Sequence, residues 1–212
     1  MKLRFAAAAA LSALTLASAS LGAQVSDGSF ENGSATSPYQ TYSQGQTFGA
    51  WTVGTGNVAV QTVDLINGYW TAKDGVKSVD LNGTSPGSVF QNIMTTSGQT
   101  YNLSFWMAGN DDASAGPRTL NAYFGNVLIG SYSWTGDSNW SHSNMEWQNM
   151  TGTFVGNGAA TSLSFVSTTT SNCCYGPVLD MVQVSATPEP SSVALLGTGL
   201  IGLVPMFRRK KK

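Results

Sequence analysis

Apolar and polar residues alternate along short segments of the chain, and glycine-rich turns separate these segments. In Tyr101–Ala108 every second residue is large and apolar, and Thr161–Ser167 repeats the pattern at Leu163 and Phe165. Such alternation is typical of β-strands with one face in a core. Short strands at this spacing predict an all-β fold, for which we expect a two-sheet antiparallel jelly-roll sandwich. The predicted strands are Trp51–Val53, Val58–Leu65, Ser78–Leu81, Ser88–Met94, Thr100–Ala108, Thr119–Phe124, Val127–Tyr132, Glu146–Phe154, Thr161–Ser167 and Val178–Val184.

Both ends of the chain depart from this pattern. The N-terminus has a basic start at Lys2 and Arg4, an apolar stretch Phe5–Leu16 and small residues up to Ala23, which is typical of a secretory signal peptide. Near the C-terminus, Val193–Phe207 is a run of 15 uncharged residues. As a helix it would be roughly 22 Å long, which is shorter than the roughly 30 Å hydrocarbon core of a bilayer. We expect a helix at each end, outside the β-sandwich, with a buried core helix as the alternative for the second. The cations after it would stay on the cytoplasmic side, and they are Arg208, Arg209, Lys210, Lys211 and Lys212.

The C-terminal segment carries a recognisable order of features: PEPSS at Pro188–Ser192, an apolar stretch and a basic end. It resembles the PEP-CTERM sorting tail of exopolysaccharide-producing Gram-negative bacteria. On this resemblance Pro188, Glu189 and Pro190 form the sorting motif, and the partner is an exosortase, a membrane transpeptidase-like enzyme that removes the tail. The protein would be exported, held at the inner membrane through the tail before processing, and then placed at the cell surface or in the extracellular matrix. The chain would comprise a signal peptide (1–23), an ectodomain (24–186) and a sorting and anchor tail (187–212).

Residues 24–186 are acidic once the two ends are set aside. They contain three basic and ten acidic residues, a net charge of −7, whereas the whole chain has −1. Proteins bind the phosphates of nucleic acids through Lys and Arg. We therefore exclude nucleic acid as a partner.

Several motifs of this acidic segment follow one another in a familiar order: DGSFENG at 27–33, VKSVDLNG at 76–83, YNLSFWMAGN at 101–110 and CCYGPVLDMVQV at 173–184. Together they resemble the choice-of-anchor C family and its plant cell-wall relatives, a domain of unknown function (642) with a galactose-binding-like jelly roll. The resemblance implies a non-enzymatic, glycan-associated surface protein that binds polysaccharide, in the first place exopolysaccharide. The alternative is a structural or adhesive surface protein that binds other proteins and has no affinity for sugar.

Three acidic residues could hold a structural calcium ion, and no cofactor is otherwise required. Glu31 follows the opening motif, Asp180 lies in the last predicted strand, and Asp80 or the Ser78 hydroxyl could add a further ligand. Calcium takes six to eight oxygen ligands, so backbone carbonyls would have to complete the site. The alternative is that Glu31 caps a turn and Asp180 accepts backbone hydrogen bonds.

Aromatic and polar residues in predicted loops could bind a glycan. A flat aromatic ring matches the C–H face of a sugar, and neighbouring polar side chains bond its hydroxyls. The alternative is that these rings belong to the core, as we expect for Trp51, Trp106 and Trp147. The candidates are Tyr69, Trp70, Asn110, Asp111, Asp112, Arg118, Trp134 and Trp140.

The remaining chemistry-bearing residues are few. Cys173 and Cys174 are the two cysteines, and in an exported protein they could close a vicinal disulfide, stay free or bridge to another chain. His142 is the one histidine, and we expect it to be a solvated surface residue. With a single histidine and no glycine-rich phosphate loop after a predicted strand, we predict no enzymatic activity.

Overall fold

The computed structural model describes residues 25–54, 60–114, 116–170 and 173–187. The signal peptide, the sorting motif and the apolar tail predicted from the sequence lie outside these ranges. No helix within them is long and apolar enough to cross a membrane. Twelve strands make up the described fold: β1 (Tyr39–Ser43), β2 (Thr47–Phe48), β3 (Trp51–Val53), β4 (Thr62–Asn67), β5 (Lys77–Asp80), β6 (Ser88–Met94), β7 (Thr100–Gly109), β8 (Arg118–Phe124), β9 (Val127–Trp134), β10 (Gln148–Val155), β11 (Ala160–Ser167) and β12 (Pro177–Ala186).

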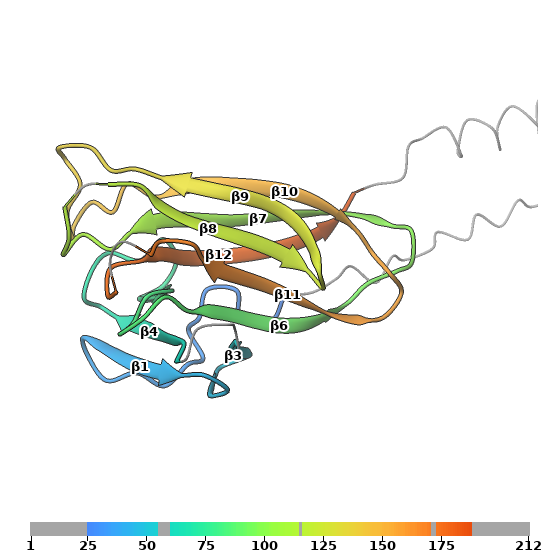
Figure 1. Cartoon of the computed structure of the whole chain (residues 1–212), viewed down its shortest axis with the longest axis horizontal. Helices are drawn as coiled ribbons and strands as arrows, with labels where there is room; N and C mark the ends of the chain where they lie inside the picture. The colour runs from blue at the N-terminus through green and yellow to red at the C-terminus, as the bar shows by residue number, and fades with distance from the viewer. Residues whose placement is uncertain (1–24, 55–59, 115, 171–172, 188–212) are drawn as a thin grey trace, which may run out of the picture.

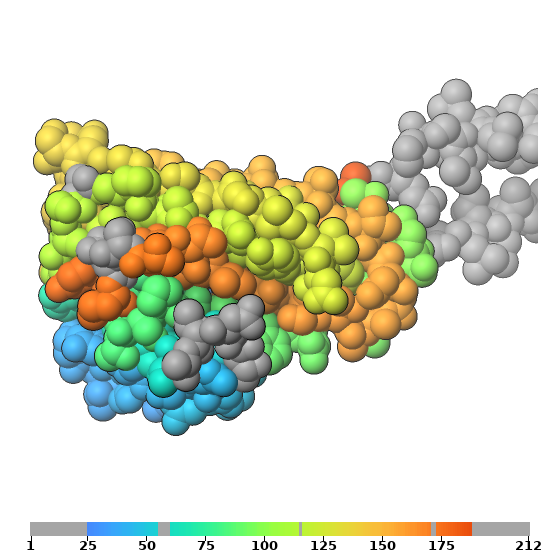
Figure 2. All heavy atoms as spheres, viewed as in Figure 1, coloured from blue at the N-terminus to red at the C-terminus, as the bar shows by residue number. Residues whose placement is uncertain are grey.

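These strands form two antiparallel sheets of six strands each (Figure 1). The first sheet has the order β1-β4-β5-β12-β7-β10, and the second has the order β2-β3-β6-β11-β8-β9. The late strands β11 and β12 are interior members of their sheets, with earlier strands on both sides. In Figure 2 these orange segments accordingly lie between the yellow-green strands above and the blue and cyan N-terminal segments below. The predicted all-β, two-sheet jelly-roll sandwich is confirmed.

The core lies between the sheets and follows from the alternation in the sequence. In β7 the side chains of Tyr101, Leu103, Phe105 and Met107 are all fully buried. Phe105 meets Phe165 of the other sheet edge to face, with ring centroids 5.0 Å apart. Burying each large apolar side chain of this kind stabilises the fold by about 1.5–3 kcal/mol.

The longest strands join the two ends of the sandwich. β7 and β12 each have ten residues and pair antiparallel, so that Ala186 at the end of β12 lies beside Tyr101 at the start of β7. Pro177 pairs with Gly109 at the opposite end. The described chain therefore leaves the sandwich at the end where β7 begins, which is the right-hand end in Figure 1.

The structure corrects several details of the sequence prediction. β1 and β2 were not predicted, and the strand expected over Val58–Leu65 runs from Thr62 to Asn67. Trp106 and Trp147 are partly exposed and do not belong to the buried core, unlike Trp51. The alternation that buries the residues on either side of Trp106 turns its ring to the outer face of the sheet, where Lys73 Nζ lies 3.6 Å from the ring centroid.

Candidate functional site

A pocket opens on the outer face of the first sheet, near the ends of β4 and β7. Its volume is about 390 Å³. Asp64 of β4 reaches it because its neighbours Val63 and Leu65 point into the core. Tyr69, Trp70, Asn110, Asp112 and Cys174, from three separate loops, also line it. Four of the candidate glycan-binding residues thus meet in one place: Tyr69, Trp70, Asn110 and Asp112.

Asp80 accepts hydrogen bonds from two of the loops that line the pocket, the loop after β7 and the loop before β12. It is fully buried and lies opposite Asp64 in the β4–β5 pair. Its Oδ1 accepts hydrogen bonds from the backbone N–H of Asn82 (2.8 Å) and of Gly176 (3.0 Å). Its Oδ2 accepts from the Asn110 side chain (2.7 Å). Burial raises the pKa of Asp80 to about 8, although these hydrogen bonds oppose the shift. Asp80 is therefore a positioning residue for Asn110 and for the loop before β12.

Tyr69 and Trp70 belong to the connection between β4 and β5 and have different roles. Trp70 is buried, and its Nε1 donates to the Ser78 hydroxyl (2.9 Å). This anchor lets Tyr69 extend across the pocket, where its hydroxyl donates to Asp112 Oδ1 (3.1 Å). Burial raises the pKa of Tyr69, and the hydrogen bond to Asp112 raises it further.

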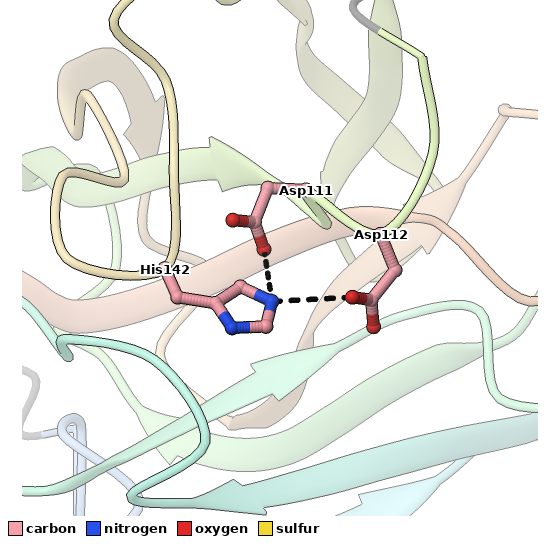
Figure 3. A group of neighbouring side chains, drawn as sticks. All are labelled: Asp111, Asp112 and His142. Carbon is pink, nitrogen blue, oxygen red and sulfur yellow. Dashed lines mark hydrogen bonds and ion pairs between the residues drawn. The ribbon is translucent and has the colours of Figure 1, made fainter.

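A cluster of two carboxylates and an imidazole adjoins the pocket (Figure 3). Asp111 and Asp112 lie just after β7, and His142 lies in the connection between β9 and β10. His142 Nε2 is 3.0 Å from Asp111 Oδ1 and 3.1 Å from Asp112 Oδ1. The His142 ring also packs against Tyr69, with centroids 4.4 Å apart. Burial raises the pKa of Asp111, and the nearby His142 opposes that shift. The surface role expected for His142 is thus wrong in one respect, because its ring is packed and paired.

Comparison with known proteins places this domain in a family. Residues 23–185 match the family model described as "Protein of unknown function (DUF642)". The chain belongs to the DUF642 family. Residues 186–212 match the "PEP-CTERM protein-sorting motif", so both resemblances expected from the sequence are confirmed. That motif implies an exported, transiently membrane-anchored protein processed by an exosortase.

The DUF642 domain also resembles a segment of one curated protein and several solved structures. Halomucin of Haloquadratum walsbyi is 28% identical over 176 residues, which are 80% of this chain and 2% of that protein's length. The CBM22-1 xylan-binding domain of Paenibacillus barcinonensis Xyn10C is 13% identical, with a TM-score of 0.47 over 71% of this chain and 95% of that one. CBM35 from Paenibacillus barcinonensis is 18% identical, with a TM-score of 0.43 over 70% of this chain and 99% of that one.

Three other candidate residues of the DUF642 domain lie away from the pocket. Trp134 is fully buried, its Nε1 donates to the Glu146 carbonyl (2.9 Å), and its ring meets Trp140 edge to face at 5.0 Å. Arg118 is buried and donates to the Gly116 carbonyl (2.9 Å). These contacts hold the loop between β9 and β10 and the loop before β8 against the sandwich. The structure therefore corrects the expectation of exposed tryptophan platforms for Trp134, and likewise for Trp70.

The three carboxyls of the calcium hypothesis, Glu31, Asp80 and Asp180, have backbone partners in the structure. Glu31 Oε1 accepts hydrogen bonds from the backbone N–H of Val76 (2.9 Å) and of Lys77 (2.7 Å). Asp180 Oδ2 accepts from the backbone N–H of Lys73 (2.8 Å) and of Asp74 (2.9 Å). These three carboxyls do not converge on one another, and within the described ranges only the cluster of Asp111, Asp112 and His142 gathers three metal-ligand side chains. These contacts of Glu31 and Asp180 match the alternative of turn capping and backbone acceptance, and the calcium site stays a prediction.

The two cysteines of the DUF642 domain form a disulfide between adjacent residues, the first of the alternatives considered. Cys174 lines the pocket, and its carbonyl accepts a hydrogen bond from the Asn110 side chain (3.4 Å). The disulfide lies in the loop that Asp80 holds through Gly176. It therefore belongs to the wall of the pocket.

Proposed function

We propose that this protein is a non-catalytic surface or matrix protein of a Gram-negative bacterium, sorted by an exosortase, whose DUF642 domain binds polysaccharide. The first candidate is the exopolysaccharide of the cell that makes it. The observation that carries the proposal is the pocket at the ends of β4 and β7, where an aromatic ring and carboxylates meet. Its volume, about 390 Å³, is within the roughly 300–1,000 Å³ typical of small-molecule sites.

The lining of the pocket suits the two kinds of contact that a sugar makes. Tyr69 offers a ring on which the C–H face of a sugar can lie. Carboxylate oxygens of Asp64 and Asp112 can accept hydrogen bonds from sugar hydroxyls, and charge-assisted bonds of this kind are the stronger ones. Both kinds of group line the same cavity.

The negative charge of the domain favours neutral over acidic glycans. Residues 24–186 have a net charge of −7, and the carboxyl-bearing Asp64 and Asp112 line the pocket without any Lys or Arg among the lining residues. An anionic sugar would meet repulsion there, because like charges in a partly buried site repel. We therefore expect neutral sugar units to bind more tightly than uronic acids.

Binding to immobilised exopolysaccharide and to a panel of neutral and acidic glycans tests the proposal. The Tyr69→Ala variant removes the ring in the pocket, and Tyr123→Ala removes a tyrosine of β8 in the other sheet. We expect Tyr69→Ala to weaken binding about tenfold, which corresponds to about 1.4 kcal/mol, while Tyr123→Ala binds like the parent. Folded parent protein that no glycan retains would refute the proposal, as would equal binding by Tyr69→Ala.

A second candidate function is adhesion to another protein. Val127 and Leu128 of β9 are 65% and 50% exposed, and β9 is an edge strand of the second sheet. An exposed apolar edge strand can pair with a strand of another chain. Two results together would favour this function. Surface proteins would cross-link to β9 in the parent but not in the Leu128→Lys variant, and the parent would not be retained on glycans.

A further inference from the structure

We propose that Asp111, Asp112 and His142 form a binding site for a divalent transition-metal ion of the zinc type. The site adjoins the proposed sugar pocket but does not depend on it. Each of the three residues contributes one ligand atom, and the three atoms lie within 4.8 Å of one another.

The spacing of the ligand atoms suits a small ion. Zinc binds carboxylate oxygen and imidazole nitrogen at roughly 2.0–2.2 Å, so two ligands at a tetrahedral angle lie about 3.4 Å apart. His142 Nε2 lies 3.0 Å from Asp111 Oδ1 and 3.1 Å from Asp112 Oδ1. A shift of a few tenths of an ångström at each side chain would open the cluster enough to admit the ion.

The hydrogen bonding of the cluster is incomplete without a cation. The Nε2 atom of an imidazole carries one proton or one metal ion, yet it faces two carboxylate oxygens at nearly equal distances. Its hydrogen bond goes to Asp112 Oδ1, whereas Asp111 Oδ1 is buried and accepts no hydrogen bond. The Asp111 side chain is only 6% exposed and points at the imidazole. An ion between the three atoms would satisfy Asp111 Oδ1, while Asp112 Oδ1 keeps its hydrogen bond from Tyr69.

The loops hold the ligands in place before any ion arrives. The His142 carbonyl accepts a hydrogen bond from the Thr71 backbone N–H (2.8 Å), and Tyr69 packs against its ring. On the other side, the Asp112 backbone N–H donates to Asn110 Oδ1 (3.0 Å). Neighbours that fix the orientation of ligands raise metal affinity. Asn110 in turn donates to Asp80 of β5 (2.7 Å), so each of the two loops that carry the ligands is tied to another element.

The types of ligand select the ion. Calcium prefers six to eight oxygen atoms, whereas an imidazole nitrogen favours zinc and neighbouring transition metals. Three protein ligands leave one position open in a tetrahedral site. Asp112 also lines the pocket, so this position can be reached from there. The two carboxylates balance the charge of the ion.

Titration calorimetry of the exported protein, first freed of metal with a chelator, tests this site. Zinc chloride and calcium chloride are the probes, and the variants are Asp111→Asn and His142→Gln. Asp137→Asn is the control, because Asp137 is a carboxylate of the same loop as His142 and lies outside the cluster. We expect one zinc ion per chain, calcium binding at least tenfold weaker than zinc, and at least tenfold weaker zinc binding in both variants but not in the control.

Thermal unfolding with and without zinc provides a second readout. Zinc that binds the folded chain raises Tm, so it should stabilise the parent and the control but neither cluster variant. Two cluster variants are used so that, if one fails to fold, the other still shows whether the cluster binds zinc. A parent that takes up no zinc would overturn the proposal, and so would zinc uptake that is unchanged in both cluster variants.

Discussion

The buried carboxyl of Asp80 should make the stability of the domain fall as the pH rises, and Asp80→Asn should remove the part of that pH dependence that Asp80 contributes. Burial raises the pKa of Asp80 from its ordinary value of 3.8 to about 8. Between these values the folded chain keeps a proton that the unfolded chain has released. The free energy of unfolding therefore decreases as the pH rises, because the unfolded state binds fewer protons than the folded state. The stabilisation is complete below the unfolded pKa and is lost as the pH passes through the folded pKa.

The size of the effect follows from the gap between the two pKa values. Each pH unit inside the gap costs about 1.4 kcal/mol, so the free energy of unfolding falls by roughly 3 kcal/mol between about pH 5 and about pH 7.5. Asparagine does not titrate and has the shape of the neutral acid. The Asp80→Asn variant should therefore lose roughly 3 kcal/mol less than the parent over that window.

Urea denaturation followed by tryptophan fluorescence measures the free energy of unfolding of the parent and of the Asp80→Asn variant at each pH. Asp180 also titrates in this range, since burial raises its pKa to about 7, but it is present in parent and variant alike. The difference between the two pH profiles thus isolates Asp80. Identical pH dependence in parent and variant would refute the reasoning, because it would mean that Asp80 has the same proton affinity in the folded and unfolded chains.

Replacing the fully buried Trp134 by Ala should lower the free energy of unfolding by about 3–5 kcal/mol in urea denaturation, and a loss below about 1 kcal/mol would contradict the packing described. In Gly109→Ala the new Cβ would lie 2.3 Å from Trp134 Cζ3, so we expect a lower Tm and a loss of about 1–3 kcal/mol, whereas an unchanged Tm would show that the Trp134 ring can move aside. Replacing both Cys173 and Cys174 by Ser should change the free energy of unfolding by less than about 1 kcal/mol, because a bridge between adjacent residues encloses almost no chain and removes little entropy from the unfolded state. A loss of several kcal/mol would indicate that the disulfide stabilises the folded loop directly.

The alternation of the sequence was sufficient to predict the core strands, and it failed where a strand does not bury one face. β7 was predicted almost to the residue because its inward side chains are all large and apolar. β1 was missed because Tyr39–Ser43 has no buried residue and shows no alternation. The strand expected from Glu146 begins at Gln148, and Glu146 has a φ of 50°, a left-handed conformation that does not continue a strand. Edge strands and irregular starts carry a weak pattern, since packing does not dictate their side chains.

The candidate site was predictable only in part, because distant loops build it. The sequence identified Tyr69, Asp111 and Asp112 as polar and aromatic loop residues, and they do meet at the pocket and the adjoining cluster. It offered no signal that His142 would join them, since 30 residues separate it from Asp112. The loop tryptophan Trp134 was expected to be exposed and is fully buried, because the loop between β9 and β10 folds back over it. A sequence pattern can indicate that a residue is in a loop, but not whether the loop folds back over the domain.

The antiparallel pair of β7 and β12 places the C-terminal end of the described chain and the pocket at opposite ends of the sandwich. Ala186 lies beside the start of β7, and the pocket lies near the end of β7. Ten residues of extended strand place the two points roughly 33 Å apart. A chain fixed through the sorting tail that begins at residue 186 would thus present the pocket at the far tip of the sandwich.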